Sequence, residues 1–160
     1  MKKILGTGLL FALCLASCKT KEPAEDTSAA INRMFDNYWE DRMKLSPLEA
    51  TNSGDNRYND TLPNDVSSHF IAAATSFYTR YADSIKNFNR ETLNENDKIS
   101  YDIFKREMDM QLEGFQFHDE LTPVNQFWSL PLTIGQLGSG DGNQPFKTVK
   151  DYDNFLGRIK

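Results

Sequence analysis

Cysteine and histidine are both scarce in this sequence, and their scarcity excludes several kinds of site. Cys14 and Cys18 are the two cysteines among 160 residues, so no disulfide framework can connect the segments that follow them. The two histidines, His69 and His118, are far apart, and neither has another metal ligand at the spacing that one helical face requires. No serine or cysteine stands beside a recognisable base. The sequence therefore predicts neither a metal site nor a catalytic residue in this chain.

Basic residues are also a minority, which argues against a nucleic-acid partner. Lysine and arginine number 18 against 23 aspartates and glutamates, giving a formal net charge of −5, and no basic cluster is present. Hydrophobic residues make up 39% of the chain and charged residues 26%. This balance is typical of one folded domain rather than of a disordered chain.

The first 17 residues have the composition of a bacterial secretion signal. Lys2 and Lys3 supply positive charge, and residues 4–15 form an apolar stretch that is too short to remain as a membrane span. Leu15-Ala16-Ser17-Cys18 follows and resembles a lipobox, the site at which bacterial lipoproteins are cleaved and lipidated on cysteine. We therefore expect residues 1–17 to be a lipoprotein signal peptide and Cys18 to carry a membrane anchor.

The residues around Cys18 also bear on where the protein resides. The alternative to a lipobox is an ordinary signal peptide followed by a cysteine that has no such role. Lys19 rather than aspartate follows Cys18, which by resemblance to other lipoproteins favours the outer membrane. Residues 18–27 are polar, contain Pro23 and lack an apolar period, so we expect a flexible tether.

Beyond the tether, apolar residues recur every three or four positions, which predicts an all-α fold. The longest such pattern runs from Val66 to Phe88 and includes Phe70, Phe77 and Tyr81, which we expect in the core. Long helices with short connections pack as an antiparallel bundle. We expect helices to begin at or beside Ser28, Pro47, Val66, Asn94 and Thr148, with ends at Gly54 and Gly114 for the second and fourth of them.

Side chains that can cap helices mark most of these starts. A serine or threonine with an acidic residue three positions later has the pattern of a capping box. The expected caps are Ser46 with Glu49, Asn64 or Asp65, Asn94, and Thr148 with Asp151.

Residues 117–146 interrupt the helical pattern with three prolines and four glycines. A loop of this length in a compact domain is uncommon and is usually functional or disordered. Its segment Gly138–Gly142 does not fit a phosphate loop, since no Lys-Ser/Thr pair follows and no strand precedes it. Asp141 does not begin a calcium loop, because Tyr152 stands at the position that requires glutamate. We expect a flexible or cleft-lining loop.

A second polar loop, residues 55–64, joins the short helix to the longest one. Asp55, Arg57 and Tyr58 are its candidate functional residues. An aspartate and an arginine two positions apart commonly fix a loop through hydrogen bonds and an ion pair. The alternative is that these side chains line a substrate groove.

Three stretches of the sequence resemble one family. Residues 38–67 read Y-W-x-x-R-x-x-x-S-P-x-x-A-T-x-x-G-D-x-R-Y-N-D-x-L-P-x-D-x-S, and residues 93–101 read L-N-E-N-D-K-I-S-Y. The third stretch, residues 130–158, contains the Gly-rich segment and closes with K-T-V-K-D-Y-D-N-F-L-G-R. In order and spacing these stretches resemble the domain-of-unknown-function 885 (DUF885) family. Its members are bacterial proteins, often lipoproteins, and resemble zinc metallopeptidases of the gluzincin type.

The resemblance implies zinc in the whole protein and a metal site outside this chain. The H-E-x-x-H helix that would bind the metal is absent here, and family members are several times longer. The apolar pattern of the last helix also continues to Lys160 without a cap. We therefore expect residues 28–160 to be the amino-terminal helical part of a larger protein, with no catalysis by this segment alone.

Two functions remain open at this point. By resemblance, the chain belongs to a metallopeptidase of the cell envelope, with the membrane, the remainder of its own polypeptide and peptides as partners. The alternative is a non-enzymatic helical lipoprotein that acts as a binding subunit of a nutrient-uptake system. An H-E-x-x-H motif beyond Lys160 would favour the enzyme.

Overall fold

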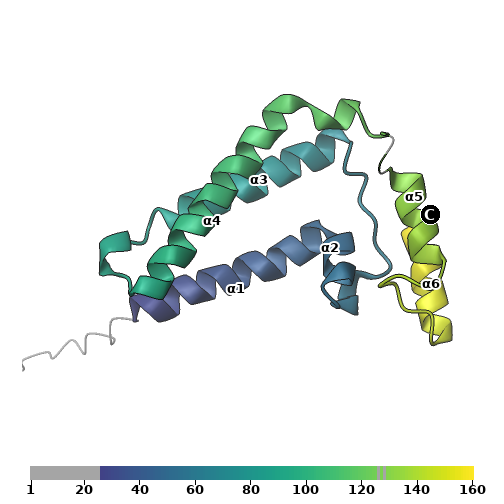
Figure 1. The fold of residues 1–160 in the computed structure, drawn as a ribbon, viewed down its shortest axis with the longest axis horizontal. Helices are drawn as coiled ribbons and strands as arrows, with labels where there is room; N and C mark the ends of the chain where they lie inside the picture. The colour runs from purple at the N-terminus through teal and green to yellow at the C-terminus, as the bar shows by residue number, and fades with distance from the viewer. Residues whose placement is uncertain (1–25, 126, 128) are drawn as a thin grey trace, which may run out of the picture.

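A computed structural model describes residues 26–125, 127 and 129–160 (Figure 1). Within these residues the chain is helical, and the isolated bridge between Val124 and Ser129 does not extend into a strand. The predicted all-α class is therefore confirmed. The expected signal peptide, Cys18 and residues 18–25 of the expected tether lie outside the described residues.

Three long helices form one unit. They are α1 (Thr27–Leu45), α3 (Ser68–Ile85) and α4 (Glu95–Gly114). Figure 1 shows α3 and α4 side by side and antiparallel, with α1 meeting them near its amino-terminal end. The core holds residues from all three helices and from the α3–α4 connection: Ile31, Tyr38, Ala74, Phe77, Tyr78, Tyr81, Ala82, Ile85, Leu93, Phe104 and Met108.

Tyr38 is the point at which the three helices meet. Its ring lies 5.6 Å from that of Phe77 on α3 and 4.8 Å from that of Phe104 on α4, centroid to centroid. The Tyr81 ring is 5.1 Å away in an edge-on arrangement, the geometry that aromatic quadrupoles favour. The prediction that Phe77 and Tyr81 are core residues is confirmed, and Phe70 packs half-buried at the edge of the same cluster.

A buried carboxylate joins the beginnings of α1 and α4. Asp97 is 7% exposed and accepts hydrogen bonds from Ser28 Oγ at 2.5 Å and Asn94 Nδ2 at 2.7 Å. Asn94 also caps α4 as predicted, because its side chain accepts from the Asp97 amide at 2.9 Å. One cluster therefore both starts α4 and fixes α1 against it.

The short helix α2 (Pro47–Asn52) begins without the predicted capping box. Ser46 makes no side-chain cap bond, and its own N–H donates to the Arg42 carbonyl at the end of α1. Glu49 does not turn back to Ser46 either, since its carboxylate accepts from Arg42 Nε at 2.9 Å. Gly54 has φ +84° just after the helix, as its expected role at the helix end requires.

The long helix α3 begins later than predicted. Neither Asn64 nor Asp65 caps it, and Val66 precedes it; the cap is Ser67, whose Oγ accepts from the Phe70 amide at 3.2 Å. The Asn64 carbonyl instead accepts from both the amide and the hydroxyl of Ser67. This turn occupies the residues that the sequence pattern assigned to the first turn of the helix.

The stretch 117–146 is not one long loop, which corrects the sequence prediction. It contains a short 3-10 turn at Asp119–Leu121 and the helix α5 (Leu130–Gly138). Pro131 stands in the first turn of α5, where its missing N–H costs no hydrogen bond. Gly140 has φ +82° in the turn that follows.

The last helix, α6 (Val149–Arg158), begins with the predicted capping box of Thr148 and Asp151. Its Phe155 ring lies 5.2 Å from that of Phe146 and packs so closely on α5 that a Cβ added to Gly138 would stand 2.9 Å from it. We call residues 129–160, which Figure 1 shows lying to one side of the three-helix unit, the arm. None of the helices in the described part of the chain is both long enough and apolar enough to span a membrane.

Candidate functional site

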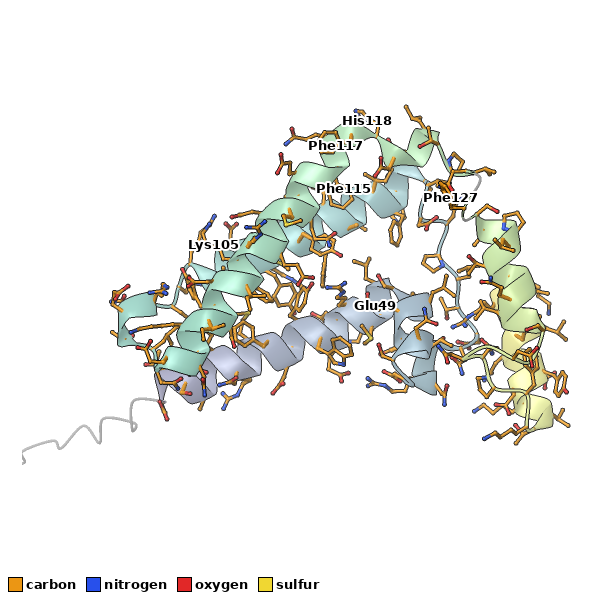
Figure 2. The ribbon with its side chains drawn as sticks, in the orientation of Figure 1. Glu49, Lys105, Phe115, Phe117, His118 and Phe127 are labelled. Atoms are coloured by element: carbon orange, nitrogen blue, oxygen red, sulfur yellow. The ribbon has the colours of Figure 1, made fainter. Side chains whose placement is uncertain are left out.

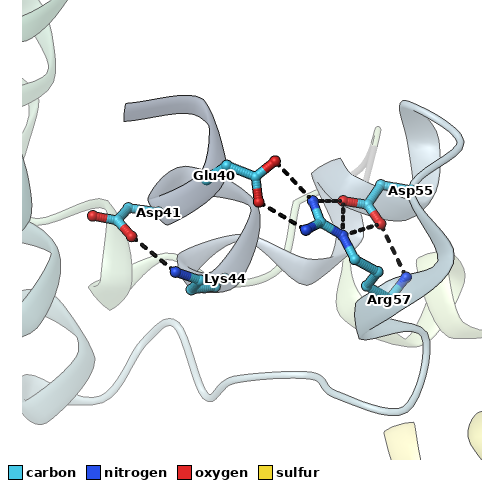
Figure 3. A network of polar contacts seen from close by, with 5 residues as sticks. All are labelled: Glu40, Asp41, Lys44, Asp55 and Arg57. Atoms are coloured by element: carbon cyan, nitrogen blue, oxygen red, sulfur yellow. Dashed lines mark hydrogen bonds and ion pairs between the residues drawn. The ribbon is translucent and has the colours of Figure 1, made fainter. Parts of the chain in front are cut away.

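The structure brings Asp55 and Arg57 together on the surface of the corner, which we define as residues 46–66. Arg57 Nη2 lies 2.7 Å from Asp55 Oδ2, and its backbone N–H donates to Asp55 Oδ1 at 3.0 Å. The other edge of the guanidinium donates to both oxygens of Glu40 on α1, at 2.7 and 3.1 Å (Figure 3). Arg57 therefore connects the corner to α1 through two carboxylates.

These contacts determine the charge state of the carboxylates. The hydrogen bonds from Arg57 lower the pKa of both Asp55 and Glu40. The Arg57 side chain is 53% exposed, so water and salt screen the ion pairs strongly. Tyr58 is half-buried, with the Arg57 guanidinium 5.5 Å from its ring centroid. The loop-fixing role of these three residues stays a prediction, for which this geometry supplies the contacts.

The corner also encloses a buried arginine that the sequence did not reveal. Arg158, the last residue of α6, is 3% exposed. An arginine in the last turn of an amphipathic helix usually points to solvent, so no pattern in the sequence indicated this one. Its acceptors are the carbonyl oxygens of Pro47 (3.4 Å), Tyr58 (2.7 Å) and Thr61 (3.1 Å), Thr51 Oγ1 (2.8 Å) and Gln144 Oε1 (2.6 Å).

Beside this cluster lies a groove of about 850 Å³. Its walls come from the corner, the carboxyl-terminal end of α4, the turn at 119–121, and both helices of the arm. Apolar side chains form much of the lining, and Asp65, Asp119 and Glu120 add negative charge. The apolar lining residues are Leu48, Leu62, Pro63, Val66, Ile71, Phe115, Pro123, Leu130, Ile134 and Ile159.

The two histidines do not form a metal site with the groups around them. His69 is exposed on α3, whereas His118 has φ 53° after α4 and its Nδ1 lies 2.9 Å from Glu120 Oε1. Figure 2 shows His118 at the far end of α4. Among residues 26–125, 127 and 129–160, no three His, Cys, Asp or Glu side chains converge as metal ligands would. This part of the chain therefore does not fit a zinc ion.

The glycine-rich segment is an ordinary turn in the structure. The Asp141 amide donates to Ser139 Oγ at 3.2 Å, and Asn143 reaches Asn52 on α2 at 3.2 Å. The segment thus connects α5 to the residues before α6 and touches the corner. Asp55, Arg57 and Tyr58 are not among the groove-lining residues, so the structure separates them from this groove.

Comparison with known proteins gives one family. The model of the family described as "Bacterial protein of unknown function (DUF885)" matches residues 47–160, which include the corner except Ser46, together with α3, α4 and the arm. Searches of curated proteins and of solved structures found no match. Because the matched residues make up more than half of the chain, this protein belongs to the DUF885 family.

Proposed function

We propose that this chain is the amino-terminal helical part of a lipid-anchored bacterial envelope protein that acts, as a whole, as a zinc-dependent metallopeptidase. The family match over residues 47–160 is the observation that carries the proposal. Members of the family resemble gluzincin-type peptidases, whose helical folds surround a substrate cleft. The all-helical structure agrees with that architecture.

The metal and the general base are assigned to residues outside this chain. The described residues offer no set of ligands for zinc, and the sequence contains no H-E-x-x-H helix. Zinc bound elsewhere in the protein would polarise a peptide carbonyl and lower the pKa of a bound water. The residues of this chain would act on the substrate by position and not by chemistry.

The groove beside the corner is the surface through which this segment would contribute. Its lining, which combines apolar side chains with Asp65, Asp119 and Glu120, suits an extended peptide whose side chains are partly apolar. The three-helix unit has its own core and so supplies a rigid support for one wall.

Membrane attachment through Cys18 is the second part of the proposal. The lipobox at residues 15–18 supports it, and stable attachment requires more than one acyl chain, as lipoproteins have. In fractionated cells, the wild type should be in the membrane pellet and the Cys18→Ala variant should not. Equal amounts of both in the pellet would contradict lipid anchoring.

The peptidase assignment is tested on the protein translated from the whole open reading frame. We expect stoichiometric zinc by elemental analysis, hydrolysis of a peptide library, loss of that hydrolysis on chelation and its return with added zinc. Retention of peptides without hydrolysis, and without zinc, would instead favour the binding subunit of an uptake system.

A further inference from the structure

The way in which α6 is held in place differs from the packing of the other long helices. Arg158 is the buried residue of α6, whereas α1, α3 and α4 bury apolar side chains. Three apolar residues of α6 are exposed, Val149 (78%), Tyr152 (55%) and Leu156 (50%), and so is Ile159 (44%), which directly follows the helix. The attachment of α6 to the corner therefore rests on a polar cluster much more than on buried apolar surface.

Arg158 is suited to holding α6 against the corner, because its guanidinium donates to acceptors on the corner and on Gln144. Its Nε and both Nη atoms donate to the oxygens already described, and all of these oxygens are neutral. Burial lowers the pKa of Arg158, but an arginine stays charged in proteins. Three of the acceptors are main-chain carbonyls of the corner. The Pro47 carbonyl also accepts from Thr51 Oγ1 and the Tyr58 carbonyl from the Thr61 amide, whereas among the described residues the Thr61 carbonyl accepts from Arg158 alone.

Other members of the cluster also bond to one another. Gln144, which accepts from Arg158, also donates from Nε2 to the Asn59 carbonyl at 3.5 Å. Thr51 Oγ1 lies 2.7 Å from Asn59 Oδ1 and accepts from Arg158. Among the described residues, no buried side-chain nitrogen or oxygen lacks a hydrogen-bond partner. Removal of the guanidinium would therefore leave the Thr61 carbonyl and Gln144 Oε1 without their donor and would weaken the hydrogen bonding of the other acceptors.

We propose that Arg158 anchors the arm to the corner, and that the arm opens as a unit of its own while the three-helix unit stays folded. The core cluster is built from α1, α3, α4 and the α3–α4 connection and includes no residue of the arm, so its integrity does not depend on α6. The groove does depend on α6, because Arg158 and Ile159 line one side of it and α5 lines another. The groove therefore exists only while the arm is anchored to the corner. This inference does not depend on the proposed peptidase activity.

Hydrogen exchange of the complete protein, read by mass spectrometry on separate peptides, tests the proposal. The variants are Arg158→Met, which keeps an unbranched side chain without donors, and Arg158→Lys, which restores charge but not the fork of donors. Lys150→Met is the matched control, because it makes the same charge change at an exposed position of the same helix.

In Arg158→Met we expect exchange of α6 amides to accelerate by about tenfold or more, with α3 and α4 unchanged within about twofold. Arg158→Lys should lie between this variant and the wild type, and Lys150→Met should match the wild type. Equal acceleration in α3, α4 and α6 would show one cooperative unit and overturn the proposal. Unchanged exchange in α6 would show that Arg158 is not the anchor. If Arg158→Met fails to fold, the same comparison is made with Arg158→Lys and Gln144→Ala.

Discussion

The main chain of Gly157 in α6 lies directly against the main chain of Asp60 in the corner. A Cβ added to Gly157 would stand 3.3 Å from the Asp60 carbonyl oxygen and 3.5 Å from the Asp60 Cβ. This close approach places the next residue, Arg158, within reach of the Thr61 carbonyl. A residue without a side chain at position 157 is therefore part of the anchor.

Gly157→Ala should loosen the arm, because the corner must move by a few tenths of an ångström to admit the methyl group. We expect faster hydrogen exchange in α6 and a lower Tm. Gly135→Ala on α5 is the control, since nothing lies within 4 Å of its added Cβ. There alanine should stabilise the helix by about 0.5–1 kcal/mol. A Gly157→Ala protein as stable as the control would mean that the corner yields without cost.

Phe77→Asp should prevent or severely weaken folding. Phe77 is 8% exposed and contacts the rings of Tyr38, Tyr78 and Tyr81, so an unpaired carboxylate would be buried in its place. Truncation of a buried phenylalanine already costs roughly 3–5 kcal/mol.

Lys86→Ala is the comparison for Phe77→Asp. Lys86 pairs with Asp83 on the exposed surface, where such ion pairs contribute about 0–1 kcal/mol. Thermal melts followed by circular dichroism separate the two variants. Similar melts for Phe77→Asp and the wild type would disprove the assigned core.

Arg57→Ala should raise the pKa of Glu40 and Asp55 towards their ordinary values, since Arg57 is the largest cause of both depressions. A depressed carboxylate pKa stabilises the fold above the unfolded-state pKa, and this contribution is lost as the pH falls through the lower folded-state value. The wild type should therefore lose more stability than Arg57→Ala below about pH 4.

Titration of the carboxylates by NMR and melts at several pH values measure these effects of Arg57. Arg106→Ala, an exposed arginine on α4, is the control. In the complete protein, loss of activity by Arg57→Ala without a change in Tm would contradict the loop-fixing role and place Arg57 in the cleft.

Tyr81 should titrate at high pH, because burial and the hydrogen bond that its hydroxyl donates to Asp41 (2.9 Å) raise its pKa to about 12. A raised folded-state pKa stabilises the fold below the unfolded value, and this contribution is lost as the pH rises from about 10 to about 12. Asp41→Asn should lower the pKa of Tyr81, as followed by ultraviolet absorbance of the tyrosinate. An unchanged titration would show that burial alone sets the pKa.

Most of the helices could be predicted from the sequence, because apolar spacing and capping residues are local features. The apolar spacing on α3 identified Phe77 and Tyr81 as core residues, and short-range caps identified the starts of α4 and α6. The helix α5 was missed because its proline and glycines resemble those of a loop, although a proline in the first turn is compatible with a helix.

The burial of Arg158 could not be predicted in this way, since the residues that contact it are distant in sequence. Nothing near Arg158 marks it as buried, and its environment comes from the corner and from Gln144. The predicted capping box at Ser46 failed for a similar reason. Arg42, which lies outside α2, binds the glutamate that the box required, and Glu107 of α4 completes that ion-pair network.

The separation of the anchor's partners along the chain also determines the order in which the molecule folds. Arg158 lies 111 positions from Pro47 and 100 from Tyr58, whereas α3 and α4 are joined by a short connection. Contacts that close long loops form late, because the entropy of closure must be met before they contribute. In a chain synthesised from its amino terminus, the three-helix unit can therefore fold first, while the Thr61 carbonyl of the corner stays hydrated until the guanidinium arrives.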